Sequence, residues 1–391
     1  MFGKTHAVGW LSKSRIIPGV NFLFLRNVFL KGILIFVILS LAIGIIPADV
    51  LGRISIYNHL IPGRPRLPFG ETPQRSYNLS LFNLEAMFAA HEISIPTDAD
   101  KETRIILLGD SSIWGTLQKP EETMAGRLNA RNLQICGKSA HFYNLGYPTI
   151  SLAKDVLILQ RALQTYPDMA VWVTTLEAFP KDKQFTSPLA ENNRIRLASI
   201  LGMDAQLATV PLGIFNSTLF AHRRELADWA RLQFYGIPWA ATGIDQDYPV
   251  RYPAAEIDLE PDETFHKLEP GDDLHSAMSW DVLQKGMSIA KQANLPILLV
   301  NEPILVSNGN NSEIRYNFYY PRWAYDVYRT EMQRQSDLND WPYLDAWNII
   351  PMQEFTNSAI HLTTTGEDLL AGRVADALKT LACNTPPTAP F

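Results

Sequence analysis

Short aliphatic runs alternate with amphipathic stretches through much of the chain. Each run ends in small or polar residues, as a strand buried on both faces of a parallel sheet does. The spacing predicts strands at residues 104–108, 141–145, 169–173, 296–300 and 343–347. Apolar side chains at helical intervals predict helices at residues 81–93, 120–129, 151–163, 219–234, 280–293, 322–335 and from 364 onward. This alternation predicts an α/β domain with a mostly parallel sheet and crossover helices.

The pattern is interrupted at about residues 180–280, where we expect an insertion into the domain. From Asp245 to Asp273 the chain is acidic and contains proline. These carboxylates could bind a cation, but their spacing does not match an EF-hand loop. We therefore expect a solvated insertion, and a lid over the site is one role that it could serve.

The longest apolar run lies near the N-terminus. Residues 28–47 contain few polar side chains and end at Pro47. As a helix, the run would extend roughly 28 Å, close to the hydrocarbon core of a bilayer at about 30 Å. We therefore expect a transmembrane signal anchor. A cleaved signal peptide is the alternative, although no clear Ala-x-Ala site follows the run.

The flanking segments predict the topology of the chain. The leader at residues 1–27 is basic and contains no acid, which predicts a single-pass protein of the cytoplasmic membrane with its N-terminus inside. Arginines at positions 53, 64, 66 and 75 reduce this asymmetry. Residues 48–80, rich in proline and arginine, predict a linker, residues 81–383 an extracytoplasmic domain, and residues 384–391 a flexible tail.

Composition excludes several classes of function. The chain has 391 residues, of which 47% are hydrophobic, so it can bury a large core. A net charge of −6 is not that of a nucleic-acid-binding domain. Cys136 and Cys383 could form one bridge but no disulfide framework or metal site. No zinc pattern or phosphate-binding glycine loop is present, so we expect no metal and no cofactor, and we interpret His91, His222, His266 and His275 as structural or surface residues.

The sharpest candidate for chemistry follows the first predicted strand. Gly109 permits a tight turn, which would place Asp110, Ser111 and Ser112 at the carboxyl end of the strand, where open α/β sheets bind their ligands. A second candidate is His361, in a loop just before the last predicted helix. A plain polar turn is the alternative for the first of these features.

Together these separated motifs resemble the SGNH/GDSL hydrolase and acyltransferase superfamily. Gly109-Asp110-Ser111 followed by Gly115 is similar to its first block, Asn144-Leu145-Gly146 to its second, and His361-Leu362 with Gly366 to its last. The resemblance implies a three-layer, flavodoxin-like fold, with Ser111 as nucleophile, His361 as general base, and the amides of Ser111 and Gly146 as oxyanion donors. Asp110 would support the turn. Ser112 is the competing nucleophile.

The chain departs from this family at two places. Thr174-Thr175-Leu176-Glu177 occupies the position where the family has an asparagine oxyanion donor. Thr174 or Thr175 could substitute as donor, or Glu177 could have another task. The family's acid three residues before the histidine is replaced by Ser358, so His361 could be oriented by Asn357, Ser358, a distant acid such as Asp345, or backbone alone.

The resemblance implies serine-dependent transfer or hydrolysis of an acyl ester. With the anchor, the chain is similar to membrane-anchored extracytoplasmic proteins of teichoic-acid D-alanylation and exopolysaccharide O-acetylation. Such proteins act on an envelope polysaccharide or lipid acceptor beside a membrane-bound O-acyltransferase, which we expect as a partner. The alternatives are an anchored esterase or lipase that acts alone, and an envelope-binding protein with a degenerate, non-catalytic site.

Overall fold

The computed structural model describes residues 22–45, 50, 83–89, 91–94, 102–135, 137–203, 223–242 and 251–382. The chain divides into two units, residues 1–46 with 213–223 and residues 47–212 with 224–391. Both cysteines, His222, the predicted tail and the predicted linker except residue 50 lie outside the described residues.

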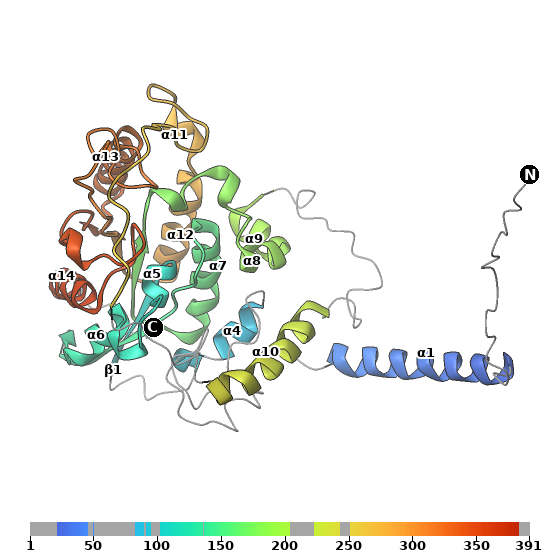
Figure 1. The fold of residues 1–391 in the computed structure, drawn as a ribbon. Helices are drawn as coiled ribbons and strands as arrows, with labels where there is room; N and C mark the ends of the chain where they lie inside the picture. The colour runs from blue at the N-terminus through green and yellow to red at the C-terminus, as the bar shows by residue number, and fades with distance from the viewer. Residues whose placement is uncertain are drawn as a thin grey trace, which may run out of the picture. The chain divides into compact units, whose positions relative to one another are not determined.

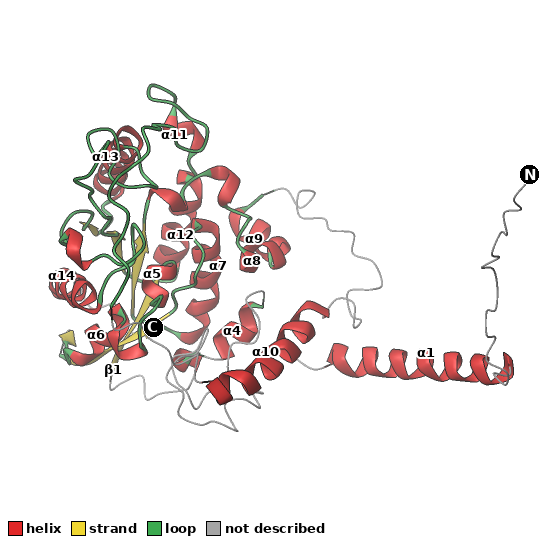
Figure 2. Cartoon of the chain, viewed as in Figure 1, coloured by secondary structure: helices red, strands yellow, loops and turns green. Residues whose placement is uncertain are grey.

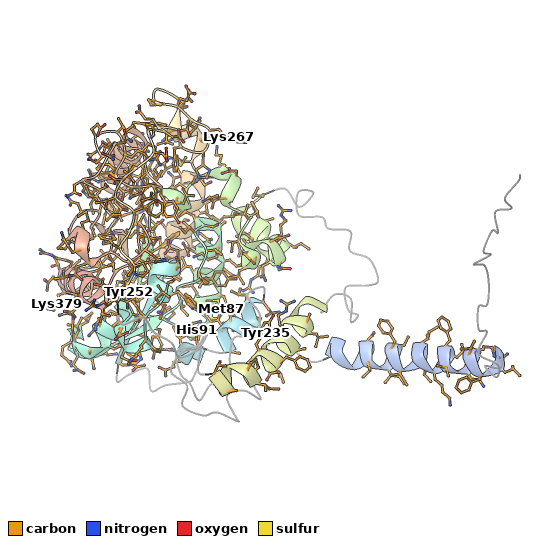
Figure 3. The ribbon with its side chains drawn as sticks, in the orientation of Figure 1. Met87, His91, Tyr235, Tyr252, Lys267 and Lys379 are labelled. Atoms are coloured by element: carbon orange, nitrogen blue, oxygen red, sulfur yellow. The ribbon has the colours of Figure 1, made fainter. Side chains whose placement is uncertain are left out.

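The first unit contains helix α1 (Phe22–Ile45). Within it, Leu23–Ser40 is the one segment of the described chain that is long and apolar enough to cross a membrane. Every residue from 23 to 39 is exposed, and the side chains point outward along the helix (Figure 3). The predicted N-terminal apolar helix is therefore present, which is consistent with a signal anchor or a signal peptide. It begins at Phe22, earlier than the predicted start at residue 28.

The second unit is built on a six-stranded sheet with the order β2-β3-β1-β4-β5-β6. Figure 1 labels β1 and the surrounding helices, and Figure 2 draws the strands in yellow. All neighbouring strands are parallel except β2 and β3, which are antiparallel. The strands are β1 (Glu102–Leu108), β2 (Gln134–Ile135), β3 (Lys138–Asn144), β4 (Met169–Thr174), β5 (Ile297–Asn301) and β6 (Tyr343–Asp345). The prediction of an α/β fold with a mostly parallel sheet is confirmed.

Helices cover both faces of the sheet. On β1, Ile106 and Leu108 pack into one apolar cluster with α7 (Leu152–Ala162), α12 (Trp280–Gln292) and α13 (Arg322–Asn339). Ile105 and Leu107 pack into the other cluster, with α6 (Met124–Ala130) and α14 (Thr364–Ala382). Alternate residues of a strand point to opposite faces, so β1 is buried on both sides. This burial is why its aliphatic run is continuous.

Several elements differ from the sequence prediction. The stretch 120–129 is interrupted at Thr123, whose hydroxyl accepts a hydrogen bond from Gly126 N and caps α6. The helix predicted at 219–234 is α10 (Arg223–Thr242), which continues through Pro238, and the helix predicted at 81–93 is only α4 (Leu84–Ala89). Short helices in segments of weak periodicity were not predicted. They are α5 (Ser111–Trp114), α8 (Pro188–Asn192), α9 (Arg194–Leu201) and α11 (Leu274–Ala277).

A buried lysine connects α7 to the ends of two strands. Lys154 is fully buried, and its Nζ donates to the carbonyl of Gly109, at 2.7 Å, and to that of Tyr147, at 3.5 Å. The same Nζ lies 2.5 Å from Asp155 Oδ1, and Trp172 Nε1 donates to Asp155 Oδ2 at 3.1 Å. One ammonium thus holds the turns that follow β1 and β3 against the same helix.

We expect Lys154→Met to lower the free energy of unfolding by about 3–5 kcal/mol, because it leaves the buried Asp155 carboxylate without a counter-charge. The double variant Lys154→Met/Asp155→Leu should lose less than the single variant, since it removes both charges. Thermal unfolding of the full chain in detergent, followed by circular dichroism, measures both. A double variant less stable than the single one would contradict this account of the pair.

Candidate active site

The turn after β1 is shaped by close packing. Asp110 caps the short helix α5, and its side chain accepts from Ser112 N at 2.8 Å. A Cβ on Gly109 would lie 2.5 Å from Ile113 Cγ1 and 3.2 Å from Val173 O, so no larger residue fits there. The turn therefore presents Ser111 at the carboxyl end of β1, as the sequence predicts.

Ser111 and His361 meet across 250 residues of sequence. Ser111 Oγ lies 2.8 Å from His361 Nε2, within hydrogen-bond distance. Burial lowers the pKa of His361, and the negative charge of Asp110 opposes this shift only in part. The imidazole is therefore neutral near pH 7, the state in which Nε2 can take a proton from a serine hydroxyl.

Ser112 forms a different pair. Its hydroxyl donates to Glu302 Oε2 at 2.8 Å, and both side chains are buried. Burial, together with the charge of Asp110, raises the pKa of Glu302 well above its ordinary value. Of the two competing serines, only Ser111 contacts His361 among the described residues. Glu302 was not predicted as a site residue, although it directly follows the buried strand β5, at the sheet edge where ligands bind.

The predicted oxyanion donor Gly146 is already engaged. Its N–H donates to Asn144 Oδ1 at 2.9 Å, while Asn144 Nδ2 donates to Ile113 O at 2.8 Å. A Cβ at Gly146 would lie 2.3 Å from Trp114 N, so this glycine allows the β3 loop to pack directly on α5. Gly146 can donate to an oxyanion only after the Asn144 side chain moves.

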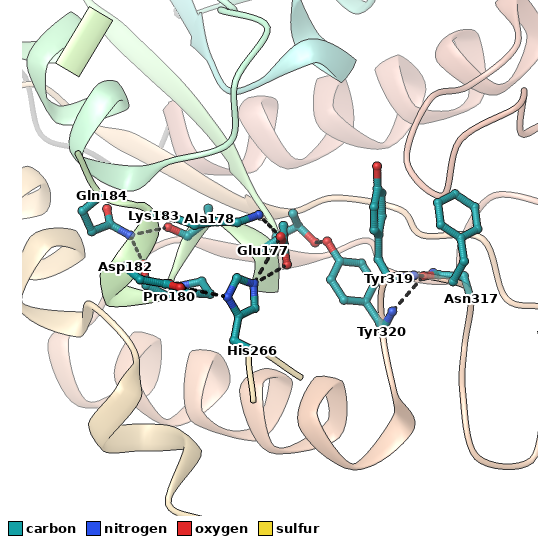
Figure 4. Close-up of polar contacts among 12 residues, drawn as sticks. Glu177, Ala178, Pro180, Asp182, Lys183, Gln184, His266, Asn317, Tyr319 and Tyr320 are labelled. Atoms are coloured by element: carbon teal, nitrogen blue, oxygen red, sulfur yellow. Dashed lines mark hydrogen bonds and ion pairs between the residues drawn. The ribbon is translucent and has the colours of Figure 1, made fainter. Parts of the chain in front are cut away.

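Thr175 and Glu177 each contact other side chains, and Figure 4 shows His266 beside Glu177. Thr175 is buried, and its Oγ1 lies 3.0 Å from Tyr320 Oη. Glu177 forms an ion pair with Lys183, and its carboxylate oxygens lie 3.3 Å from His266 Nε2, within hydrogen-bond distance. Burial lowers the pKa of Lys183. Glu177 therefore belongs to a separate charged cluster and forms no hydrogen bond to Ser111 or His361 within the described chain.

None of the three residues expected to orient His361 bonds to its ring within the described residues. Asp345 accepts from Asn301 Nδ2 at 2.8 Å and from Arg329 at 2.6 Å, so that distant acid is occupied elsewhere. Ser358 Oγ accepts from Ile360 N at 3.4 Å, and Asn357 Oδ1 from Thr356 Oγ1 at 3.5 Å.

The loop that carries His361 is held through its backbone instead. Thr356 donates to the His361 carbonyl from its N–H at 2.9 Å and from its hydroxyl at 3.3 Å. Both bonds hold the main chain at His361, and neither of them reaches its imidazole ring, so how the ring is oriented stays a prediction.

A cleft of about 280 Å³ opens beside His361. Its lining combines aromatic, aliphatic and polar side chains from three segments of the chain: Thr116, Leu117, Phe318, Tyr319, Asn357, Ser358 and His361. Phe318 and Tyr319 were not predicted, because the sequence around them shows neither periodicity nor a motif. No group of three or more metal-ligating side chains occurs within the described residues.

Comparison with known proteins finds similarity only among solved structures. No family model matches the chain, and no curated protein matches its sequence. The esterase EstA from Pseudoalteromonas is 11% identical, with 72% of this chain and 100% of that chain covered and a TM-score of 0.37. A GDSL-like lipase from Bacteroides thetaiotaomicron is 7% identical, with 73% and 91% covered and a TM-score of 0.35. An aryl esterase from M. smegmatis is 12% identical, with 72% and 99% covered and a TM-score of 0.33.

The buried position of His361 predicts its titration. Since burial lowers its pKa, the ring should gain its proton only below the ordinary value of about 6.5, and should be neutral at higher pH. NMR of ¹³C-histidine-labelled protein would follow the ring signal, assigned by its loss in His361→Gln. The same signal in urea, where the ring is exposed, should titrate near the ordinary value. A folded-state midpoint at or above the unfolded one would contradict the structure.

Proposed function

We propose that this protein hydrolyses or transfers acyl esters, with Ser111 as nucleophile and His361 as general base. The observation that carries the proposal is the 2.8 Å distance between Ser111 Oγ and His361 Nε2. Ser111 Oγ attacks the acyl carbonyl while His361 Nε2 takes its proton. The alcohol of the ester then leaves with that proton, and a serine ester remains. Water or a second hydroxyl completes the reaction by the reverse steps.

The charges around Ser111 and His361 are compatible with this reaction. The Asp110 carboxylate favours the imidazolium that forms when His361 takes a proton, as its effect on the His361 pKa indicates. Burial disfavours the ionised form of Glu302, which would otherwise add a negative charge beside Ser112. The Ser111 amide, and Gly146 after movement of Asn144, are the oxyanion donors that we assign.

The apolar helix suggests where the reaction takes place. We propose that α1 is retained as a signal anchor with the N-terminus inside, so that the catalytic domain is extracytoplasmic. A tethered enzyme is best suited to an acceptor fixed in the envelope, such as a glycan or lipid. A membrane-bound O-acyltransferase would be a fitting source of acyl groups. An anchored esterase that acts on its own remains the second candidate.

Labelling with a fluorophosphonate tests the nucleophile, because the probe reacts covalently with an activated serine. We expect the wild-type chain to be labelled, and Ser111→Ala and His361→Ala to lose at least about 10³-fold in rate. Ser112→Ala is the matched control and should keep labelling, since Ser112 faces Glu302. Labelling that persists in Ser111→Ala would refute the nucleophile, and an unlabelled wild type would favour the non-catalytic alternative.

Reporter fusions test the topology. An alkaline phosphatase fused at the C-terminus should be active, because that enzyme folds only outside the cytoplasm, and a green fluorescent protein fused there through the same secretion route should be dark. The reverse pair of results would overturn the proposed orientation. Release of the domain into the medium would identify α1 as a cleaved signal peptide.

A further inference from the structure

Two aromatic side chains stand exposed beside the candidate dyad. Phe318 and Tyr319 are 36% and 41% exposed, and they line the same cleft as His361. Their ring centroids lie 4.7 Å apart, at an interplanar angle of 54°. Partial burial and the nearby Asp110 carboxylate raise the pKa of Tyr319, so its neutral phenol lies near the turn that carries Ser111.

The loop that presents these rings is held firmly. Asn317 is fully buried, and its Oδ1 accepts from Tyr319 N at 2.9 Å and from Tyr320 N at 3.0 Å (Figure 4). Its Nδ2 donates to Leu305 O at 2.9 Å. Arg315 Nη2 donates to the Phe318 carbonyl at 2.9 Å, and Tyr320 is anchored on Thr175.

Buried polar side chains thus fix the backbone on both sides of Phe318 and Tyr319, while the two rings themselves stay in solvent. Because its backbone is fixed, this loop keeps the apolar rings of Phe318 and Tyr319 partly exposed. A less constrained loop could bury them. Such exposure beside a reactive centre indicates contact with a ligand.

The other side chains that line the cleft indicate which class of ligand binds there. Thr116, Asn357 and Ser358 place hydroxyl and amide groups around the aromatic pair. A pyranose ring has apolar C–H faces that stack on aromatic rings and hydroxyls at its edge that need hydrogen-bond partners. An alkyl chain would offer no acceptor to the Asn357 Nδ2 and Ser358 O–H groups, whereas the hydroxyls of a sugar can accept from both. The volume of about 280 Å³ is enough for one sugar ring.

We propose, on the basis of the function proposed above, that Phe318 and Tyr319 bind a pyranose ring that is the alcohol side of the ester. In transfer, a sugar hydroxyl attacks the acyl carbon of the Ser111 ester and gives its proton to His361 Nε2. The bond from the acyl carbon to Ser111 Oγ breaks, and Oγ takes that proton back. In hydrolysis of a sugar ester, the same subsite holds the leaving hydroxyl.

The test measures binding in the full chain, in detergent, with the Ser111→Ala variant so that no turnover occurs. Saturation-transfer NMR would use methyl β-D-glucopyranoside, methyl β-D-galactopyranoside and the methyl glycoside of N-acetylglucosamine as probes. Cyclohexanemethanol is the matched probe, with a ring of similar size and a single hydroxyl. We expect at least one pyranoside to bind more tightly than cyclohexanemethanol.

Substitutions of Phe318 and Tyr319 distinguish stacking of the sugar on an aromatic ring from general apolar contact. In the same background, Phe318→Leu and Tyr319→Leu keep an apolar side chain but lose the ring, and should each weaken binding of that pyranoside by about tenfold. Tyr319→Phe keeps the ring and should bind it within about threefold of the parent. If both leucine variants bind the pyranoside as tightly as the parent does, the rings of Phe318 and Tyr319 do not bind the sugar and the proposal is wrong. If cyclohexanemethanol binds more tightly than every pyranoside, the cleft is not a sugar subsite. That result would favour an acyl or alkyl group as the ligand.

Different measurements test the sugar subsite and the proposed reaction, so each can be rejected without the other. Absence of binding by all three pyranosides, with fluorophosphonate labelling of Ser111 intact, rejects the sugar subsite alone. Pyranoside binding that depends on Phe318 and Tyr319, in a chain whose wild type is not labelled, supports the subsite and rejects the acyl-transfer chemistry.

Discussion

The candidate site depends on the placement of one buried ammonium. Lys154 Nζ donates to the carbonyl of Gly109, at the turn that presents Ser111, and to that of Tyr147, in the loop after β3. Removing a lysine from water is costly, and the adjacent Asp155 and the two carbonyls compensate for that cost only in this geometry. The two hydrogen bonds from Lys154 Nζ therefore fix α7 relative to the two turns, and Asp155, on the same helix, supplies the counter-charge. With Gly146 packed on Trp114, the turn that carries Ser111 has little freedom to shift.

Two buried acids, Glu302 and Glu367, lie beside Ser112, and burial disfavours their ionised forms. Burial raises the pKa of Glu302, and it raises that of Glu367 to about 8. Asp110 supports the turn by accepting the Ser112 amide, and its effect on the pKa of His361 is that of a negative charge. The Ser112 hydroxyl donates to Glu302 and so gives one oxygen of that buried carboxyl a hydrogen-bond partner.

Sequence alone was enough to predict the sheet and the two central residues. Buried parallel strands need continuous aliphatic runs, so β1, β4 and β5 were visible directly. Ser111 and His361 were visible because the turn and the loop that carry them have motifs. Phe318, Tyr319 and Glu302 were not predicted, because their positions are set by loops held through side chains far apart in sequence, such as Arg315 and Asn317. Lys154 was hidden as well, since one lysine in an amphipathic helix ordinarily faces solvent.

The two departures from the family pattern have different physical meanings. Glu177, where an amide donor would be expected, pairs with Lys183 and His266, so its charge is balanced away from the dyad. The missing acid before His361 is not replaced by another carboxylate on the ring within the described residues, and the pKa of His361 stays low. A base of low pKa withdraws a proton from a serine less readily. If Ser111 and His361 react as we propose, they are therefore better suited to an activated ester than to a stable one.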